Sequence, residues 1–134
     1  MMKKNTKGFT LIELLVVIAI IGLLATLAVV ALNNARAKSR DARRISDIKQ
    51  IQTALEMYYN DASAYPTALG TQIATGSNTF MVSVPSDPQN TGSYVYTYSG
   101  GGTSDYAITF QLESGAGGFT AGTNVTASPS GLSQ

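Results

Sequence analysis

A single acidic residue, Glu13, stands inside a run of apolar residues that extends from Phe9 to Leu32. A carboxylate in an apolar segment of membrane length is costly unless it has a partner. Cleavage between Gly8 and Phe9 would create a positively charged amine at Phe9, at the same end of this segment. An amine and a carboxylate attract strongly in apolar surroundings, because little solvent screens them. The Phe9 amine of one chain and Glu13 of a staggered neighbour could therefore neutralise each other and set the axial offset between the chains.

The segments around Glu13 indicate a leader and a membrane-length helix. Residues 1–8 are short and polar and carry Lys3, Lys4 and Lys7, as in the basic region of an export signal. Residues 9–32 exceed the roughly 20 residues that a spanning helix needs. We therefore predict a leader peptide over 1–8 and a single-pass transmembrane or filament-core helix over 9–32.

The helical pattern continues past the apolar run as an amphipathic helix over residues 33–61. Apolar residues recur at steps of three, four or seven, while charges and amides fill the other faces. Asn60 and the Tyr65-Pro66 pair favour an end near Tyr59, because a residue that precedes proline is pushed out of helical geometry. The predicted stripe consists of Ala35, Ala42, Ile45, Ile48, Ile51, Leu55 and Tyr58.

The remaining residues, 62–134, predict a small globular head with about three or four strands. A short apolar run over 78–84 precedes two alternating segments, 94–98 and 106–112, which glycines separate. Such segments indicate antiparallel strands. A weaker strand is expected within 118–126 and a loose tail over 128–134. The fold class is α+β: a long N-terminal helix, hydrophobic in its first half and amphipathic in its second, with a small antiparallel sheet.

Composition excludes several kinds of chemistry. The chain has neither Cys nor His, so disulfides, Cys/His zinc sites and Ser-His or Cys-His catalytic pairs are absent. No convergent acid pair stands out, so we expect no catalytic residues, no cofactor and no metal site. No basic residue follows Lys49, so nucleic acid is not an expected partner of the head. The tyrosines at 94, 96 and 98 fit a packed sheet face better than a binding platform.

The sequence from Lys7 to Val17, KGFTLIELLVV, resembles the processing site of type IV prepilins and of type II secretion pseudopilins. Residues 54–61, Tyr65-Pro66 and the segment 85–88 are similar to major pseudopilins. The resemblance implies that a prepilin peptidase cleaves between Gly8 and Phe9 and N-methylates Phe9. It also implies that Glu13 engages a neighbour's N-terminus during assembly. The proline of many relatives near Val30, the pilin disulfide and an aspartate-rich calcium loop have no counterpart in this sequence.

The resemblance implies a structural, non-enzymatic function. The first expectation is a type IV pilus-like surface filament, a helical homo-oligomer built on an inner-membrane assembly platform. The alternative is a pseudopilin of a type II secretion or competence system, and a more remote one is a membrane-anchored monomeric binding protein. The precursor would span the cytoplasmic membrane before it enters an extracellular filament or a periplasmic pseudopilus.

Three simpler interpretations stay open at this point. Glu13 could sit near the membrane surface, where it would also suit the helix dipole. Residues 1–32 could form an ordinary signal peptide, with cleavage after Ala37. The basic residues from Arg36 to Arg44 could bind lipid headgroups or acids of neighbouring chains (Asp41, Asp47 and Glu56 are candidates), or they could be a solvated face. They outnumber the basic residues of the leader, which conflicts with the positive-inside rule.

Overall fold

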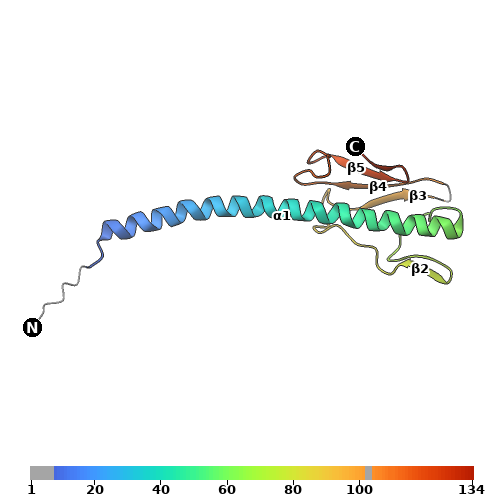
Figure 1. Ribbon diagram of the computed structural model, residues 1–134, viewed down its shortest axis with the longest axis horizontal. Helices are drawn as coiled ribbons and strands as arrows, with labels where there is room; N and C mark the ends of the chain where they lie inside the picture. Colours follow the sequence, from blue (N-terminus) through green and yellow to red (C-terminus); the bar gives the residue numbers. More distant parts are fainter. Residues whose placement is uncertain (1–7, 102–103) are drawn as a thin grey trace, which may run out of the picture. The chain divides into compact units, whose positions relative to one another are not determined.

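The computed structural model describes residues 8–101 and 104–134. It confirms the predicted class, because one long helix is followed by small antiparallel sheets (Figure 1). The chain forms two compact units, Met1–Ala35 and Arg36–Gln134. The elements are α1 (Leu11–Ala62), β1 (Ile73–Thr75), β2 (Asn78–Met81), β3 (Thr97–Gly100), β4 (Tyr106–Gln111), β5 (Asn124–Ser128) and β6 (Gly131–Ser133).

Helix α1 ends three residues later than Tyr59, the end that the sequence predicted. Ser63, which follows the last helical residue, has a φ of 56°, and its N–H donates to the Tyr59 carbonyl at 2.7 Å. A residue in the left-handed conformation that bonds back to the last turn is a common way to end a helix. Ser63 therefore ends the helix, and Tyr65-Pro66 comes after that stop.

In the first unit, α1 is apolar on every side. Each large apolar side chain from Phe9 to Leu32 is at least 45% exposed. The helix is long and apolar enough to cross a membrane, although a signal sequence near an N-terminus would meet the same criterion. A helix that is hydrophobic all round needs lipid or other protein around it.

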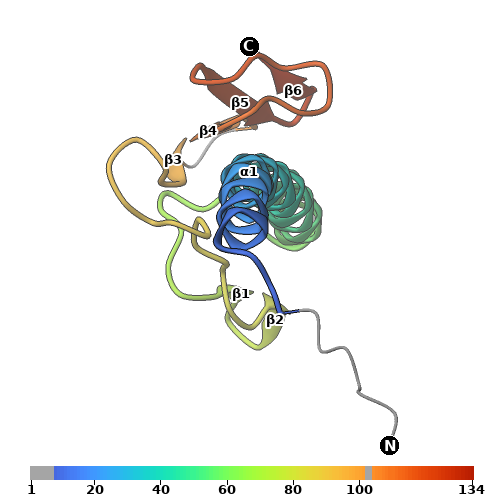
Figure 2. The same ribbon diagram turned by 90° about the vertical axis from the view of Figure 1, so that its left-hand side faces the viewer.

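In the second unit, two sheets lie on different sides of α1 (Figures 1 and 2). One sheet has the strand order β3-β4-β5-β6, and each neighbouring pair is antiparallel. The other is the hairpin of β1 and β2. Residues that face each other across the larger sheet include Tyr98 with Ile108 and Phe110 with Val125.

The hydrophobic core lies between α1 and the larger sheet. Ile48, Ile51 and Leu55 of the predicted stripe are buried, and they belong to one cluster with Phe110 and Val125. The stripe does not extend upstream as predicted, because Ala35 and Ala42 are exposed. Three charged residues of α1 are buried there in their place: Asp41, Arg44 and Asp47.

The head has more strands than the three or four expected. Strand β1 was not anticipated, and β6 lies in the segment expected to be a loose tail. Both are three-residue strands joined to a partner by two-residue loops, 76–77 and 129–130. Alternation cannot identify such short strands, because it needs four or more residues. Strand β3 begins at Thr97 rather than at Tyr94, so only the end of the predicted segment pairs with β4.

Candidate assembly site and the Arg44 ion-pair cluster

Glu13 has a partner within its own chain, which the sequence analysis missed. The Thr10 N–H and the Thr10 hydroxyl each donate to Glu13 Oε2 at 2.8 Å. In return, the Glu13 N–H donates to Thr10 Oγ1 at 3.2 Å. This reciprocal arrangement is a capping box, which satisfies the free N–H groups at a helix start. The signal was present in the sequence as Thr-x-x-Glu ahead of an apolar run.

The capping box leaves one oxygen of the Glu13 carboxylate unused. The Thr10 N–H and the Thr10 hydroxyl both donate to Oε2, so within the part of the chain that the structure describes Oε1 remains to accept another donor. Helix α1 begins at Leu11, one residue after Thr10. The box thus fixes Glu13 at the start of the helix, four residues from Phe9.

The predicted cleavage junction is open to solvent. Phe9 is 82% exposed and Gly8 is exposed as well. A Cβ atom added to Gly8 would meet nothing within 4 Å. The lysines of the predicted leader, at positions 3, 4 and 7, lie outside the described residues. Gly8 and Phe9 therefore precede the first turn of α1, which contains Glu13, in an exposed segment that another protein can reach.

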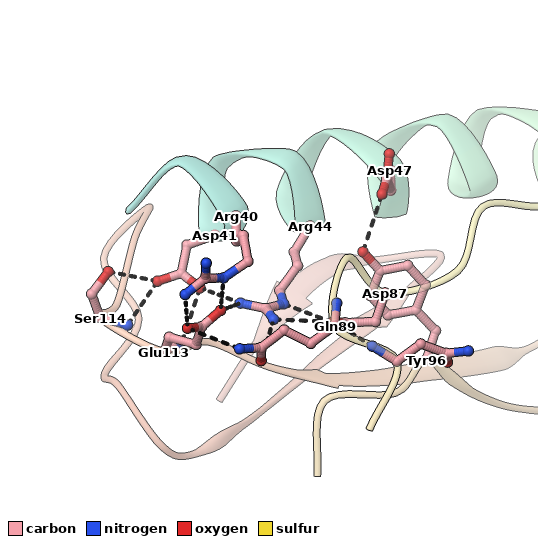
Figure 3. A network of polar contacts seen from close by, with 10 residues as sticks. Arg40, Asp41, Arg44, Asp47, Asp87, Gln89, Tyr96, Glu113 and Ser114 are labelled. Carbon is pink, nitrogen blue, oxygen red and sulfur yellow. Dashed lines mark hydrogen bonds and ion pairs between the residues drawn. The ribbon is translucent and has the colours of Figure 1, made fainter. Parts of the chain in front are cut away.

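The second polar feature is the ion-pair cluster centred on Arg44 that Figure 3 shows. The Arg44 side chain is fully buried. Its Nε and Nη2 atoms donate to the two carboxylate oxygens of Asp87 at 2.6 and 3.0 Å. Its Nη1 atom donates to Asp41 at 2.8 Å and to Glu113 at 2.6 Å. The Arg44 guanidinium carbon lies over the Tyr94 ring, 4.8 Å from the ring centroid. A planar guanidinium suits such bidentate and stacked contacts better than a lysine would.

The carboxylates around Arg44 hold the loops of the head to α1. Asp41 accepts the N–H groups of Glu113 and Ser114 at 2.9 and 2.7 Å, and also the Ser114 hydroxyl at 2.7 Å. Arg40 makes a bidentate contact with Glu113 at 2.7 and 2.6 Å. Asp41 and Arg44 thus tie the segment after β4 and the 87–89 loop to one stretch of the helix.

The same geometry keeps these carboxylates ionised. Burial alone would raise the pKa of Asp41, but the N–H groups of Glu113 and Ser114, with Arg44, lower it overall. Burial likewise opposes ionisation of Asp87, yet its bonds to Arg44 and to the Gln89 N–H lower its pKa. The hydrogen bond from Arg40 lowers the pKa of Glu113.

Asp47 is the exception on this face of α1. Burial raises the pKa of Asp47, and the Tyr96 hydroxyl, which donates to it at 3.2 Å, offsets only part of that effect. Its contact with Arg43, at 3.8 Å, is long, and Arg43 is largely exposed. Asp47 therefore does not belong to the set of strongly paired acids.

We expect acid to weaken the head through the Arg44 cluster. A carboxylate whose pKa is lowered by folding contributes stability above its unfolded pKa, and this contribution is lost as the pH falls through the lower folded value. The loss should therefore begin below about pH 4, the unfolded pKa of Asp and Glu. Denaturant unfolding of the full chain in detergent, followed by tyrosine near-UV circular dichroism at pH 7, 5, 4 and 3, measures it.

The matched variants for this experiment are Asp87→Asn and Asp47→Asn. In Asp87→Asn the free energy of unfolding should fall less steeply with decreasing pH below about pH 4, because one of the carboxylates that take up a proton is gone. Asp47→Asn should not reduce this steepness, since the raised pKa of Asp47 contributes in the opposite direction. A pH profile that Asp87→Asn leaves unchanged would contradict the assignment.

The structure separates the acids and bases that the sequence analysis had grouped. Arg40 and Arg44 point into the cluster, whereas Arg36, Lys38 and Arg43 are exposed. Asp41 and Asp47, two of the three candidate partners for basic residues of neighbouring chains, are buried and bonded within their own chain. Glu56 alone of the three stays exposed.

The remaining residues of interest also have local contacts. Tyr96 and Tyr98 pack on the core, and the Tyr98 hydroxyl donates to the Pro66 carbonyl at 2.7 Å. Asp87 and Glu113 are ion-paired with arginine. Among the described residues no group of three or more acids could hold a metal ion.

Comparisons with known proteins divide the chain into two matched regions. Residues 3–29 match the prokaryotic N-terminal methylation motif. Residues 30–128, well over half of the chain, match the family described as type II secretion system (T2SS), protein G. No solved structure matches.

Several curated relatives are similar to this chain. The type II secretion system core protein G of Dickeya chrysanthemi is 37% identical over 89 residues, which cover 66% of this chain and 56% of that protein. The core protein G of Escherichia coli is 46% identical over 61 residues, or 46% of this chain and 42% of that one. The type IV major fimbrial protein FimA of Dichelobacter nodosus is 49% identical over 55 residues, or 41% and 35%.

The matched region spans about half the length of the secretion proteins that this chain is similar to. The predicted resemblance to pilins and pseudopilins is confirmed, and proteins of this class are structural and not enzymes. The order of the two expected functions changes, because the pseudopilin alternative has more support than the type IV pilus placed first. The chain belongs to the type II secretion system protein G family.

Proposed function

We propose that this chain is a pseudopilin, which assembles through residues 9–32 into the helical pseudopilus of a type II secretion system. Its precursor would span the cytoplasmic membrane once. A prepilin peptidase would cleave between Gly8 and Phe9 and methylate the Phe9 amine. An inner-membrane assembly platform would then move the subunit from the bilayer into a filament in the cell envelope.

The observation that carries this proposal is the apolar first part of α1. It exposes every large apolar side chain from Phe9 to Leu32, and burial of apolar surface is the main favourable term in protein association. Lipid can cover this surface in the precursor, and the same segments of other copies can cover it in a polymer. A helix used in both environments needs an all-round apolar surface, which this one has.

Glu13 is the residue that would make assembly specific. Its Oε2 atom is bonded to Thr10, so an incoming amine would approach Oε1. The Phe9 amine of a neighbour is a suitable donor, because charge-assisted bonds are stronger than neutral ones. This pairing would neutralise the carboxylate in the filament core and would fix the axial offset between the two chains.

The proposal is tested by complementation in the native host. Deletion of the gene should abolish export of the proteins that the secretion system releases, and the intact gene should restore it. Gly8→Leu should fail to restore export, because the new side chain would occupy the cleavage junction, where an added Cβ atom meets nothing within 4 Å and the head is far away in the sequence. The exported proteins are measured on gels of the culture medium.

Gly70→Ala, which lies outside the proposed assembly segment, is the matched control for that test. An added Cβ at Gly70 meets only the Gln72 carbonyl oxygen, at 3.7 Å, which is an ordinary van der Waals distance. Gly70→Ala should therefore restore export fully. Normal export by the deletion strain would contradict the proposed function.

A type IV pilus subunit is the second candidate, supported by the similarity to the fimbrial protein of Dichelobacter nodosus. The two candidates differ in the polymer that cells make at native expression. Electron microscopy of sheared surface material would find long fibres of this chain for a pilus. A pseudopilus predicts none under the same conditions.

A further inference from the structure

The exposed charges of α1 that follow its apolar part are all positive. In residues 33–49 the two acids, Asp41 and Asp47, are buried. Two of the six basic residues in this stretch, Arg40 and Arg44, are bonded within the ion-pair cluster. The other four are exposed: Arg36, Lys38, Arg43 and Lys49. The helix therefore presents a purely basic surface just after the segment of membrane length.

Most of these exposed cations are not neutralised by the chain itself. In residues 8–101 and 104–134 the cations of the ion pairs are Arg40, Arg43 and Arg44 alone. The pair of Arg43 with Asp47 is long, at 3.8 Å. The charges of Arg36, Lys38 and Lys49 are thus available to an anionic partner.

The exposed cations lie on two different sides of the helix. Arg36 and Arg43 are seven residues apart, about two turns, so they share one side. Lys38 and Lys49 are 11 residues apart, about three turns, and share another. Arg36 and Lys38 point in directions about 160° apart around the axis. A protein that lies along one side of α1 cannot contact both, whereas lipid surrounds a spanning helix on every side.

Two of the cations fall at the level of lipid headgroups when residues 9–32 span a bilayer. The headgroup layer on each side is about 5–8 Å thick, which corresponds to about 3–5 residues of helix. Arg36 follows Leu32 by four residues and Lys38 follows it by six. Long basic side chains extend along a helix to keep their charge at the interface. Both charges can therefore reach the headgroups.

The other two exposed cations lie farther along the helix. Arg43 is 11 residues beyond Leu32, about 16 Å, and is already paired with Asp47. Lys49 is 17 residues beyond Leu32, about 26 Å. Exposed charges are largely screened over more than about 8 Å at physiological salt. Lys49 is therefore out of reach of the headgroups.

We propose that Arg36 and Lys38, which we call the basic collar, bind anionic phospholipids of the leaflet on the C-terminal side of the span. Basic side chains beside a membrane are attracted to anionic lipid, and an arginine can donate two hydrogen bonds to one phosphate group. Contacts on opposite sides would hold the end of the spanning segment at the headgroups. This inference rests on the membrane-spanning precursor of the proposed function and adds the lipid class that the precursor selects.

Spin-labelled lipids in vesicles that contain the full chain test the proposal. Electron paramagnetic resonance separates lipid whose motion the protein restricts from bulk lipid, and gives an association constant for each labelled lipid. Every chain compared carries Lys3→Gln, Lys4→Gln and Lys7→Gln, so that the leader cannot bind anionic lipid at the other surface. In phosphatidylcholine vesicles, labelled phosphatidylglycerol should associate about fivefold more strongly than labelled phosphatidylcholine.

The variants separate the basic collar from other exposed charges. Arg36→Gln with Lys38→Gln should bring the ratio of the two association constants close to one. Lys49→Gln is the matched control, because Lys49 is also exposed and without an ion pair, and it should leave the ratio unchanged. Arg36→Lys with Lys38→Arg should keep most of the preference, since both charges remain. Added salt should lower the ratio, because it screens the attraction.

The outcomes distinguish this inference from the proposed function. Equal association of the two labelled lipids with the basic collar intact would overturn the inference, leave the precursor in the membrane, and indicate an acidic protein surface as the partner. An equal loss of preference in Lys49→Gln and in the collar variant would overturn the assignment to Arg36 and Lys38. A chain that restricts the motion of neither lipid would contradict the membrane-spanning precursor and, with it, the proposed function.

Discussion

Glu13→Ala is expected to leave cleavage after Gly8 intact and to reduce the polymer at least about tenfold, the effect of losing one charge-assisted hydrogen bond on an association constant. The side chain starts four residues beyond the junction, so the peptidase substrate is unchanged there. In the polymer the Phe9 amine of a neighbour would lose its only proposed acceptor. The measurement compares processed chain in the sedimented polymer with processed chain left in the membrane, by gel.

The capping box gives this prediction a sharper control. Glutamine can replace glutamate in a capping box, so Glu13→Gln keeps the bond to Thr10 while it removes the charge. Thr10→Val does the reverse, because it removes the hydroxyl and keeps the carboxylate. We expect Glu13→Gln to assemble as poorly as Glu13→Ala, and Thr10→Val to assemble better than either. Normal assembly of Glu13→Gln would mean that Glu13 only caps the helix.

Arg44→Met is expected to destabilise the head by about 3–5 kcal/mol, the usual cost of breaking a buried ion pair from one side. The substitution would leave Asp41 and Asp87 buried without their cation. Whole domains are stable by only about 5–15 kcal/mol, so the variant head would be close to unfolding at room temperature. Denaturant unfolding of the full chain in detergent, with tyrosine near-UV circular dichroism as the signal, measures the loss.

Arg43→Met is the matched control for the Arg44 variant. Arg43 is one residue away on the same helix, but its side chain is 67% exposed and contacts Asp47 only at 3.8 Å. Exposed pairs of this kind contribute about 0–1 kcal/mol, so its effect should be small. Adding Asp41→Asn and Asp87→Asn to Arg44→Met should recover part of the stability, because the uncompensated charges are then removed. Equal effects of the two arginine variants would contradict the cluster as described.

The long helix was predictable because its signals are strong and local. The apolar run to Leu32 and the stripe of Ile48, Ile51 and Leu55 each extend over several turns, and periodicity of that length identifies a helix. Strand β4 was predictable for the same reason, since its alternation continues over six residues. Strands β1 and β6 could not be predicted, because three residues are too few for alternation of apolar and polar residues to be recognised.

The Arg44 cluster could not be read from the sequence, since it depends on contacts between distant residues. Arg44 bonds Asp87 and Glu113, which are 43 and 69 residues away. The helical pattern placed Arg44 on a polar face, because a charged residue is rarely fully buried unless paired. Only the tertiary fold supplies those partners. The capping box of Thr10 and Glu13 is different, because its three-residue spacing could have been read directly from the sequence.

The order of the two expected functions depended on residues outside the N-terminal motif. Pilins and pseudopilins share the processing motif of Gly8, Phe9 and Glu13, so that motif alone does not separate them. The match over residues 30–128 gives the pseudopilin more support, because it covers the second part of α1 and strands β1 to β5. The absence of cysteine agrees with a head that is held together by the Arg44 cluster and the core.

The central claim is that the Phe9 amine of one subunit pairs with Glu13 of another in the polymer. Electron cryo-microscopy of the assembled filament, at a resolution that shows side chains, tests it most directly. We predict a chain that begins at Phe9, with its amine within about 4 Å, ion-pair distance, of Glu13 Oε1 of a neighbouring subunit. A filament in which Glu13 contacts only Thr10 of its own chain, with the Phe9 amine elsewhere, would contradict the account.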